Sequence, residues 1–129
     1  MSAGEGSGKG RETILFVEDQ EDVAEVAQAM LEELGYDVVF ASDAQAALDI
    51  LEKRTDIDLL LTDIVMPGSL NGAELARRVQ DEMGLKAVLV TGYADKAIPT
   101  DQFERFDVIL KPFRMDELGE RIRAALDAQ

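Results

Sequence analysis

Residues 58–67 of the chain read Asp58-Leu59-Leu60-Leu61-Thr62-Asp63-Ile64-Val65-Met66-Pro67. The short apolar run from Asp58 to Thr62 predicts a buried strand, and the proline marks the loop that follows it. Asp63 is thereby placed at the carboxyl edge of a sheet, where open α/β sheets hold their functional sites. A single acid at such a position is ordinary, so its significance depends on the residues that end the other strands.

Length and composition limit the classes of protein to consider. The chain has 129 residues, of which 47% are hydrophobic and 31% charged, as expected for one globular domain. The 27 acidic and 13 basic residues give a net charge of -14, which argues against direct binding to nucleic acid. The absence of Cys and His excludes disulfides, thiolate or imidazole metal ligands and Ser-His catalysis. Without an apolar run of membrane-spanning length or a signal peptide, we expect a cytoplasmic protein.

The first twelve residues predict a flexible tail, because residues 1–10 hold four glycines and two serines. Gly4 to Gly10 superficially resembles a phosphate-binding loop around Lys9. That pattern requires Gly six residues before the lysine and Ser or Thr after it, and this chain has Ala3 and Gly10 there. A linker is therefore the better interpretation, and the domain is expected to span residues 13–129.

From Thr13 onward, apolar runs alternate with amphipathic stretches. Strands are predicted at Thr13 to Val17, Asp37 to Ala41, Asp58 to Thr62, Lys86 to Val90 and Asp107 to Leu110. Helical stripes are predicted as Val23, Val26, Ala27, Met30, Leu31 and Leu34; Ala44, Ala47, Leu48 and Leu51; Leu75, Ala76 and Val79; and Met115, Leu118, Ile122 and Leu126. We expect Ser42 or Asp43 to cap the second helix, and a short or distorted helix in residues 94–105, which Pro99 interrupts.

Strands joined by helices of this length require crossover connections, so the sheet should be parallel and covered on both faces. All strands of such a sheet end at one edge. The polar residues at those ends are Glu18, Asp19, Asp63, Thr91 and Lys111. We therefore expect these five side chains to converge.

The chemistry of that set favours phosphoryl transfer with a metal ion. Three carboxylates repel one another, and Mg²⁺ relieves this because it accepts a few carboxylate oxygens and keeps several waters. Asp63 would then attack phosphorus, while Thr91 and Lys111 stabilise the phosphoryl oxygens. Taken singly, Glu18 and Asp19 are better explained as first-turn helix acids, Thr91 as a loop hydroxyl and Lys111 as a solvated charge.

Four short motifs together resemble one known family over Thr13 to Leu126. They are Phe16-Val17-Glu18-Asp19, Leu61-Thr62-Asp63-Ile64-Val65-Met66-Pro67, Thr91-Gly92 and Lys111-Pro112-Phe113, each at the end of a predicted strand. The family is the receiver domain of bacterial two-component response regulators, of the kind found as single domains or attached to hybrid histidine kinases. The resemblance implies a flavodoxin-like, doubly wound, five-stranded parallel sheet of order 2-1-3-4-5 with helices on both faces.

The resemblance also implies roles for particular residues. Asp63 matches the phosphoacceptor, and Thr91 and Lys111 match the pair that contacts the phosphoryl group. The metal would be Mg²⁺, held by Asp19, by Glu18 through water, by Asp63 and by the backbone carbonyl of Val65. The phosphoryl group would come from a histidine kinase or a histidine phosphotransfer protein. The chain would then be a signalling switch that catalyses only its own phosphorylation and slow dephosphorylation.

Three positions differ from the common pattern of the family. Glu18 replaces the more frequent Asp, and the loop between Pro67 and Gly72 is one residue longer. Val108 stands where many receivers carry a Tyr or Phe that turns inward on phosphorylation. We hypothesise that Tyr93 or residues 94–105 transmit the signal instead.

Other interpretations remain open at this point. A haloacid-dehalogenase-like phosphatase also uses a strand-end Asp with Mg²⁺, but it needs a second acid two residues later, where this chain has Val65. An inert flavodoxin-like binding module is a third reading. We expect a downstream protein partner, no nucleic acid or membrane partner, and no output domain, as in a single-domain regulator or a receiver taken from a hybrid kinase. A homodimer through the face of the fourth and fifth strands also remains open.

Overall fold

The computed structural model describes residues 12–64, 71–91, 106–110 and 114–127. In these residues five strands alternate with helices. The strands are β2 (Thr13–Val17), β3 (Asp37–Ala41), β4 (Leu59–Asp63), β5 (Lys86–Thr91) and β6 (Asp107–Leu110). The helices are α1 (Glu21–Glu33), α2 (Ala44–Lys53), α3 (Gly72–Met83) and α4 (Met115–Asp127). The predicted tail before Glu12 and the predicted helix in residues 94–105 lie outside the described residues.

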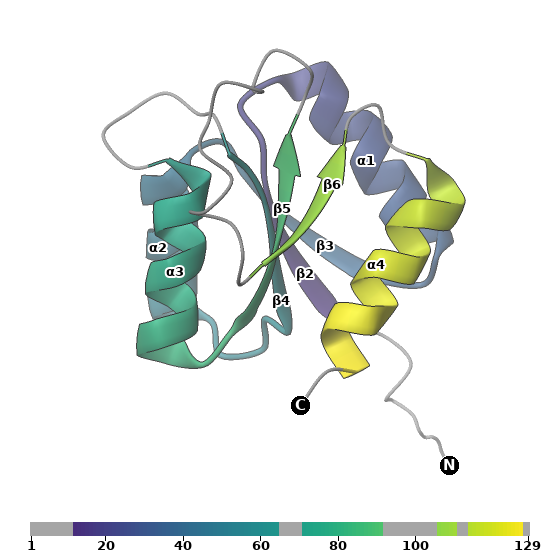
Figure 1. Ribbon diagram of the computed structural model, residues 1–129. Helices are drawn as coiled ribbons and strands as arrows, with labels where there is room; N and C mark the ends of the chain where they lie inside the picture. The colour runs from purple at the N-terminus through teal and green to yellow at the C-terminus, as the bar shows by residue number, and fades with distance from the viewer. Residues whose placement is uncertain (1–11, 65–70, 92–105, 111–113, 128–129) are drawn as a thin grey trace.

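The strands form one parallel sheet in the order β3-β2-β4-β5-β6. Counted along the chain, this is the predicted order 2-1-3-4-5. Helices α2 and α3 cover one face of the sheet and helices α1 and α4 cover the other (Figure 1). The architecture is therefore the predicted flavodoxin-like, doubly wound fold.

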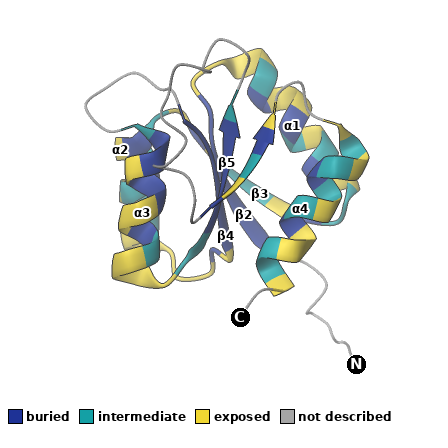
Figure 2. Cartoon of the chain, viewed as in Figure 1, coloured by how far each residue is buried: buried dark blue, intermediate teal, exposed yellow. Residues whose placement is uncertain are grey.

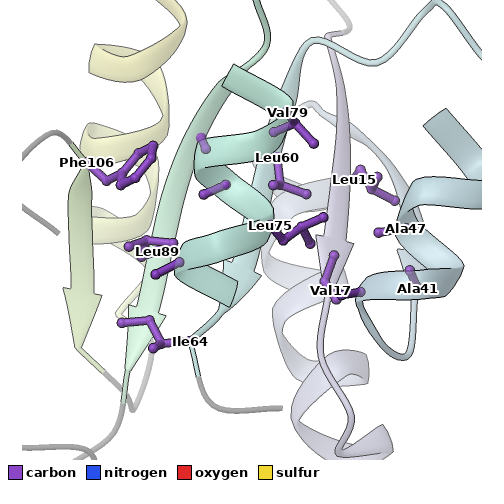
Figure 3. Close-up of a cluster of buried hydrophobic side chains, with 14 of the residues drawn as sticks. Leu15, Val17, Ala41, Ala47, Leu60, Ile64, Leu75, Val79, Leu89 and Phe106 are labelled. Carbon is purple, nitrogen blue, oxygen red and sulfur yellow. The ribbon is translucent and has the colours of Figure 1, made fainter. Parts of the chain in front are cut away.

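The central strands are apolar because both of their faces are buried. Every residue of β2 and β4 is buried, whereas the outward surfaces of the helices are exposed (Figure 2). Leu15, Leu60 and Leu89 join the cluster under α2 and α3, which Figure 3 shows together with Phe106. Residues of alternate parity, such as Leu59 and Leu61, join the cluster under α1 and α4. Each strand thus supplies both cores, which fixes the register of its side chains.

Helix α1 differs from its predicted stripe at one position. Val26 was expected on the buried face, but 54% of its surface is exposed, whereas Ala24, Ala27 and Leu31 are buried. These three residues repeat at helical spacing, and Val26 lies about 200° around the helix from Ala24. The buried face therefore begins with two small alanines and not with valine.

The third strand begins and ends one residue later than predicted. Asp58 lies before β4, where its Oδ2 accepts a hydrogen bond of 2.8 Å from the backbone N–H of Thr13. Asp63 is the last residue of β4 and pairs with Val90 of β5. The backbone of Asp63 is consequently held by the sheet itself.

The start of α2 and the end of α1 follow the expected capping rules. Asp43 caps α2 by accepting a hydrogen bond of 2.8 Å from the N–H of Ala46, and Gly35 after α1 has φ +99°. The part of the chain that the structure describes contains no helix long and apolar enough to cross a membrane.

Candidate functional site

An acidic cluster lies at the carboxyl edge of the sheet. Glu18 follows β2 directly, Asp19 is the next residue, and Asp63 ends the neighbouring strand β4. One carboxylate oxygen from each of the three lies within 4.8 Å of the others. The predicted convergence of these three acids is therefore present in the structure.

The three acids differ in their exposure to solvent. Glu18 is fully buried and Asp63 is 4% exposed, whereas Asp19 is exposed. The cluster is thus shielded from solvent at Glu18 and Asp63 and accessible to solvent at Asp19. Such a site suits a cation that keeps some of its waters.

The backbone fixes Glu18 at the base of the cluster. Its N–H donates to the carbonyl of Ala41 at 3.1 Å, which continues the pairing between β2 and β3 by one residue. Its Oε2 accepts a hydrogen bond of 3.1 Å from the N–H of Gln20, which immediately precedes α1. Glu18 is therefore held both by the sheet and by the start of α1.

The electrostatics of the cluster favour a bound cation. Two like charges about 4 Å apart repel by roughly 1 kcal/mol in water and roughly 4 kcal/mol in a partly buried environment. At metal–oxygen distances of about 2.1 Å, the ligands of an octahedral Mg²⁺ ion are about 3.0 Å apart when adjacent and about 4.2 Å apart when opposite. Three oxygens that lie within 4.8 Å of one another are near enough for one ion to draw them together. The donor set therefore fits a hard divalent cation.

Helix α3 begins directly beside Asp63. Asn71 caps the helix and forms a capping box with Glu74, in which the N–H of each residue donates to the side chain of the other at 3.1 and 2.9 Å. The N–H of Gly72 donates to the carbonyl of Ile64 at 2.8 Å. A β-carbon on Gly72 would lie 1.8 Å from the carbonyl oxygen of Asp63. Only glycine permits this approach of α3 to the end of β4.

The structure places the remaining predicted site residues only in part. Thr91 ends β5 and is half-buried, and the register places it one residue beyond Val90, the partner of Asp63. Val65, Lys111 and Tyr93 lie outside the described residues. Lys111 does follow β6 directly, and Leu110, the last residue of that strand, pairs with Thr91.

Val108, at the position where many receivers carry an aromatic residue, lies in β6. Val108 is half-buried and packs against the cluster under α2 and α3. Phe106, two residues earlier, is 9% exposed and belongs to the same cluster (Figure 3). In this cluster the aromatic side chain is therefore that of Phe106, two residues before Val108.

Thr62 and Gly72 are site residues that the sequence reasoning missed. The hydroxyl of Thr62 is buried and donates to the carbonyl oxygen of Asp63 at 3.0 Å. The signal for Thr62 was a lone polar residue in the strand Leu-Leu-Leu-Thr-Asp, next to the acid. The signal for Gly72 was weaker, because glycine after Asn71 also fits an ordinary turn.

A doubly wound parallel sheet with an acidic cluster at its carboxyl edge defines the structural class. The family model described as the response regulator receiver domain matches residues 14–123. The chain therefore belongs to the response regulator receiver domain family, which functions in two-component systems.

Curated relatives of several sizes match the chain. The response regulator receiver protein CpdR of Brucella abortus (strain 2308) is 36% identical over 118 residues, which cover 89% of this chain and 97% of that protein. Response regulator ArlR of Staphylococcus haemolyticus is 34% identical over 119 residues, 90% of this chain and 53% of that protein. Sensor kinase CckA of Brucella abortus is 31% identical over 126 residues, 93% of this chain and 13% of the kinase. The chain thus spans about half the length of ArlR.

Solved structures match the fold over nearly the whole chain. A putative response regulator from Chloroflexus aurantiacus J-10-fl gives a TM-score of 0.81 at 30% identity, with 92% of this chain and 99% of that chain covered. The receiver domain of hybrid histidine kinase CckA gives a TM-score of 0.71 at 31% identity, covering 89% and 99% of the two chains.

Proposed function

We propose that this receiver domain accepts a phosphoryl group on Asp63 in a magnesium-dependent reaction and thereby changes its binding to a protein partner. The acidic cluster carries the proposal, because Asp63 lies in reach of two further carboxylates at the edge where a ligand would enter. Membership of the receiver family supports the same reading. The donor would be a phosphohistidine on a sensor kinase or on a histidine phosphotransfer protein.

The proposed reaction is a displacement at phosphorus. A carboxylate oxygen of Asp63 forms a bond to phosphorus as the bond from phosphorus to the imidazole nitrogen breaks, and that nitrogen takes up a proton. Thr91 and Lys111 would stabilise the phosphoryl oxygens as charge shifts onto them. Attack of water on the acyl phosphate then returns Asp63 and releases phosphate. Apart from these steps on its own carboxylate, the domain would not act as an enzyme.

Magnesium would be held by Glu18, Asp19, Asp63 and the backbone carbonyl of Val65. Bound there, it would offset the charge of the carboxylates and of the incoming phosphoryl group. Glu18 is buried and fixed by the N–H of Gln20, so it suits a contact through water better than a direct one. Asp19 is exposed and adjusts more easily to the ion.

We propose that the downstream protein partner binds to the surface formed by β5, β6 and α4. Leu110 of β6 is 44% exposed on it, and Arg121 of α4 bonds to Asp107 of β6 at 2.8 Å. Since Val108 replaces an aromatic residue, Tyr93 or residues 94–105 would carry the change to this surface. A Tyr93→Ala variant that keeps full phosphorylation-dependent partner binding would contradict the role of Tyr93.

One assay tests the proposed chemistry. The protein is incubated with Mg²⁺ and acetyl phosphate, and its intact mass is measured. We expect a single phosphoryl adduct that is absent in Asp63→Asn and present in Asp58→Asn. The second variant is a matched control, because Asp58 directly precedes the same strand, at the end far from the acidic cluster, and bonds to Thr13. No adduct in the unchanged protein would favour an inert binding module, and rapid turnover of phosphomonoesters would favour a phosphatase.

A further inference from the structure

Thr62 is a polar residue in an otherwise aliphatic part of the core. It follows three leucines in β4 and is fully buried. A buried hydroxyl costs free energy unless it finds a hydrogen-bond partner. Its hydroxyl donates to the backbone carbonyl of the next residue, Asp63, at 3.0 Å.

The side chains of Thr62 and Asp63 point to opposite faces of the sheet. Leu60 and Ile64 pack under α2 and α3, and alternation along the strand places Thr62 on that face. Asp63 has the parity of Leu61, which packs under α1 and α4. Thr62 therefore cannot contact a group bound at the carboxylate of Asp63 directly, and any effect on the chemistry passes through the backbone.

The peptide group between Asp63 and Ile64 is fixed by several contacts. The hydroxyl of Thr62 holds its oxygen, and its N–H donates to the carbonyl of Val90 at 2.9 Å. Gly72 approaches the same oxygen so closely that no β-carbon fits there. This peptide group connects Asp63 to the residues that begin the following loop.

We propose that Thr62 is a positioning residue for Asp63, acting through the hydrogen bond from its hydroxyl to the carbonyl of Asp63. The bond fixes the peptide plane that follows Asp63, and so fixes both the direction of the Asp63 side chain and the point from which the next residues leave the sheet. The inference depends on the proposed function, because it concerns the rate at which Asp63 accepts a phosphoryl group. Misplacing a nucleophile slows a reaction even when every reacting group is present.

Three variants and a control separate positioning from simple packing. Thr62→Val removes the hydroxyl with little change in shape, Thr62→Ala removes it together with bulk, and Thr62→Ser keeps it. Thr13→Val is the matched control, since Thr13 is a buried threonine at the far end of the adjacent strand β2. For each protein, the rate of adduct formation is measured against acetyl phosphate concentration at saturating Mg²⁺. The thermal midpoint is measured in parallel.

We expect Thr62→Val to lower the maximal rate about fivefold, the effect of losing one ordinary hydrogen bond from the reactive arrangement. The acetyl phosphate concentration at half-maximal rate should not change, because Thr62 does not contact the donor. Thr62→Ser should restore the rate, Thr62→Ala should match Thr62→Val or fall below it, and Thr13→Val should behave as the unchanged protein. Without metal or donor, the amide of Ile64 should exchange its hydrogen faster in Thr62→Val than in Thr62→Ser.

Three results would overturn the inference. Equal maximal rates for Thr62→Val and the unchanged protein would show that the bond does not position Asp63, while leaving the proposed function intact. A Thr62→Ser variant as slow as Thr62→Val would assign the effect to packing. If the unchanged protein forms no adduct, the proposed function fails, and the role of Thr62 fails with it.

Discussion

Gly72 lies against the backbone of Asp63, so that a β-carbon on residue 72 would be 1.8 Å from the Asp63 carbonyl oxygen. The nearby atoms all belong to the backbone of Asp63 and Ile64 and cannot rotate away. Carbon and oxygen atoms that are not bonded to each other do not approach so closely. Either the start of α3 or the end of β4 would have to move to accept a side chain.

We therefore expect Gly72→Ala to destabilise the domain by roughly 3 kcal/mol or more, as overpacking against a fixed backbone does. Gly119→Ala is the matched control, because its β-carbon would be 3.1 Å from a methyl group of the flexible Leu34 side chain. Gly119 lies within α4, where alanine favours the helix by up to about 1 kcal/mol. Urea unfolding of both variants checks the prediction, and equal stabilities would contradict it.

The Gly72 contact also shows where sequence reasoning stops. The apolar strands predicted a sheet that is covered on both faces, because Leu60 is buried on one face and Val88 on the other. A parallel sheet of this kind brings Glu18 and Asp63 to the same edge. The spacing between Asp63 and Gly72 contained no sign that the two residues touch. Contacts of this kind depend on the angle at which a helix leaves its loop, which periodicity does not encode.

One error and one omission in the sequence predictions have the same physical origin. The sequence prediction places Val26 on the buried face of α1 because it is apolar, yet the small Ala24 is buried in its place. The prediction counts Thr62 as the end of an apolar run and gives its hydroxyl no role, yet that hydroxyl donates to the carbonyl of Asp63. In both cases the three-dimensional neighbours, and not the polarity of the residue, decide its place.

The second prediction concerns repulsion within the acidic cluster. Asp19 lies within 4.8 Å of Glu18 and Asp63 by their carboxylate oxygens. Without metal, Asp19→Asn should raise the free energy of unfolding by about 1 kcal/mol, a value kept small because Asp19 is exposed. Glu25→Gln, which removes an exposed acid on α1 outside the cluster, should change it little.

Added Mg²⁺ should make the unchanged protein and Glu25→Gln more stable to unfolding than Asp19→Asn, the reverse of the order expected without metal. At a concentration a hundred times its dissociation constant, a ligand stabilises the folded protein by about 2.7 kcal/mol. The unchanged protein and Glu25→Gln should show this gain, whereas Asp19→Asn should lose most of it. Thermal unfolding with and without Mg²⁺ provides the measurement. An equal gain in Asp19→Asn would show that Asp19 does not belong to the proposed metal site.

The third prediction concerns the attachment of α4 to the sheet. The ammonium group of Lys86, at the start of β5, donates to the carbonyl of Leu126 in the last turn of α4 at 2.9 Å. Lys86→Met should lower the free energy of unfolding by about 1 kcal/mol, because it removes this charged hydrogen bond at the end of a helix. Lys53→Met, in the exposed last turn of α2, is the control and should cost less. Urea unfolding distinguishes the two, and equal losses would show that the Leu126 bond adds nothing.

The fourth prediction concerns stability at high pH. Burial of Tyr36, which is 5% exposed, raises the pKa of its hydroxyl above the ordinary value of 10.0. The nearby Arg123 opposes this rise, while Glu12 and Asp127 add to it. Because the folded protein holds the phenol proton more tightly than the unfolded chain, Tyr36 stabilises the fold fully below pH 10. That contribution is lost as the pH rises from 10 through the raised pKa of the folded state.

Comparison with Tyr36→Phe isolates this effect, since phenylalanine does not ionise and lysine titration is common to both proteins. The thermal midpoint of the unchanged protein should fall more steeply than that of Tyr36→Phe as the pH passes 10, and the difference between them should be constant between pH 7 and 9. Parallel curves across the whole range would show that Tyr36 titrates alike in the folded and unfolded states. A steeper fall in Tyr36→Phe would reverse the sign of the argument, because it would mean that the folded protein favours the ionised phenol.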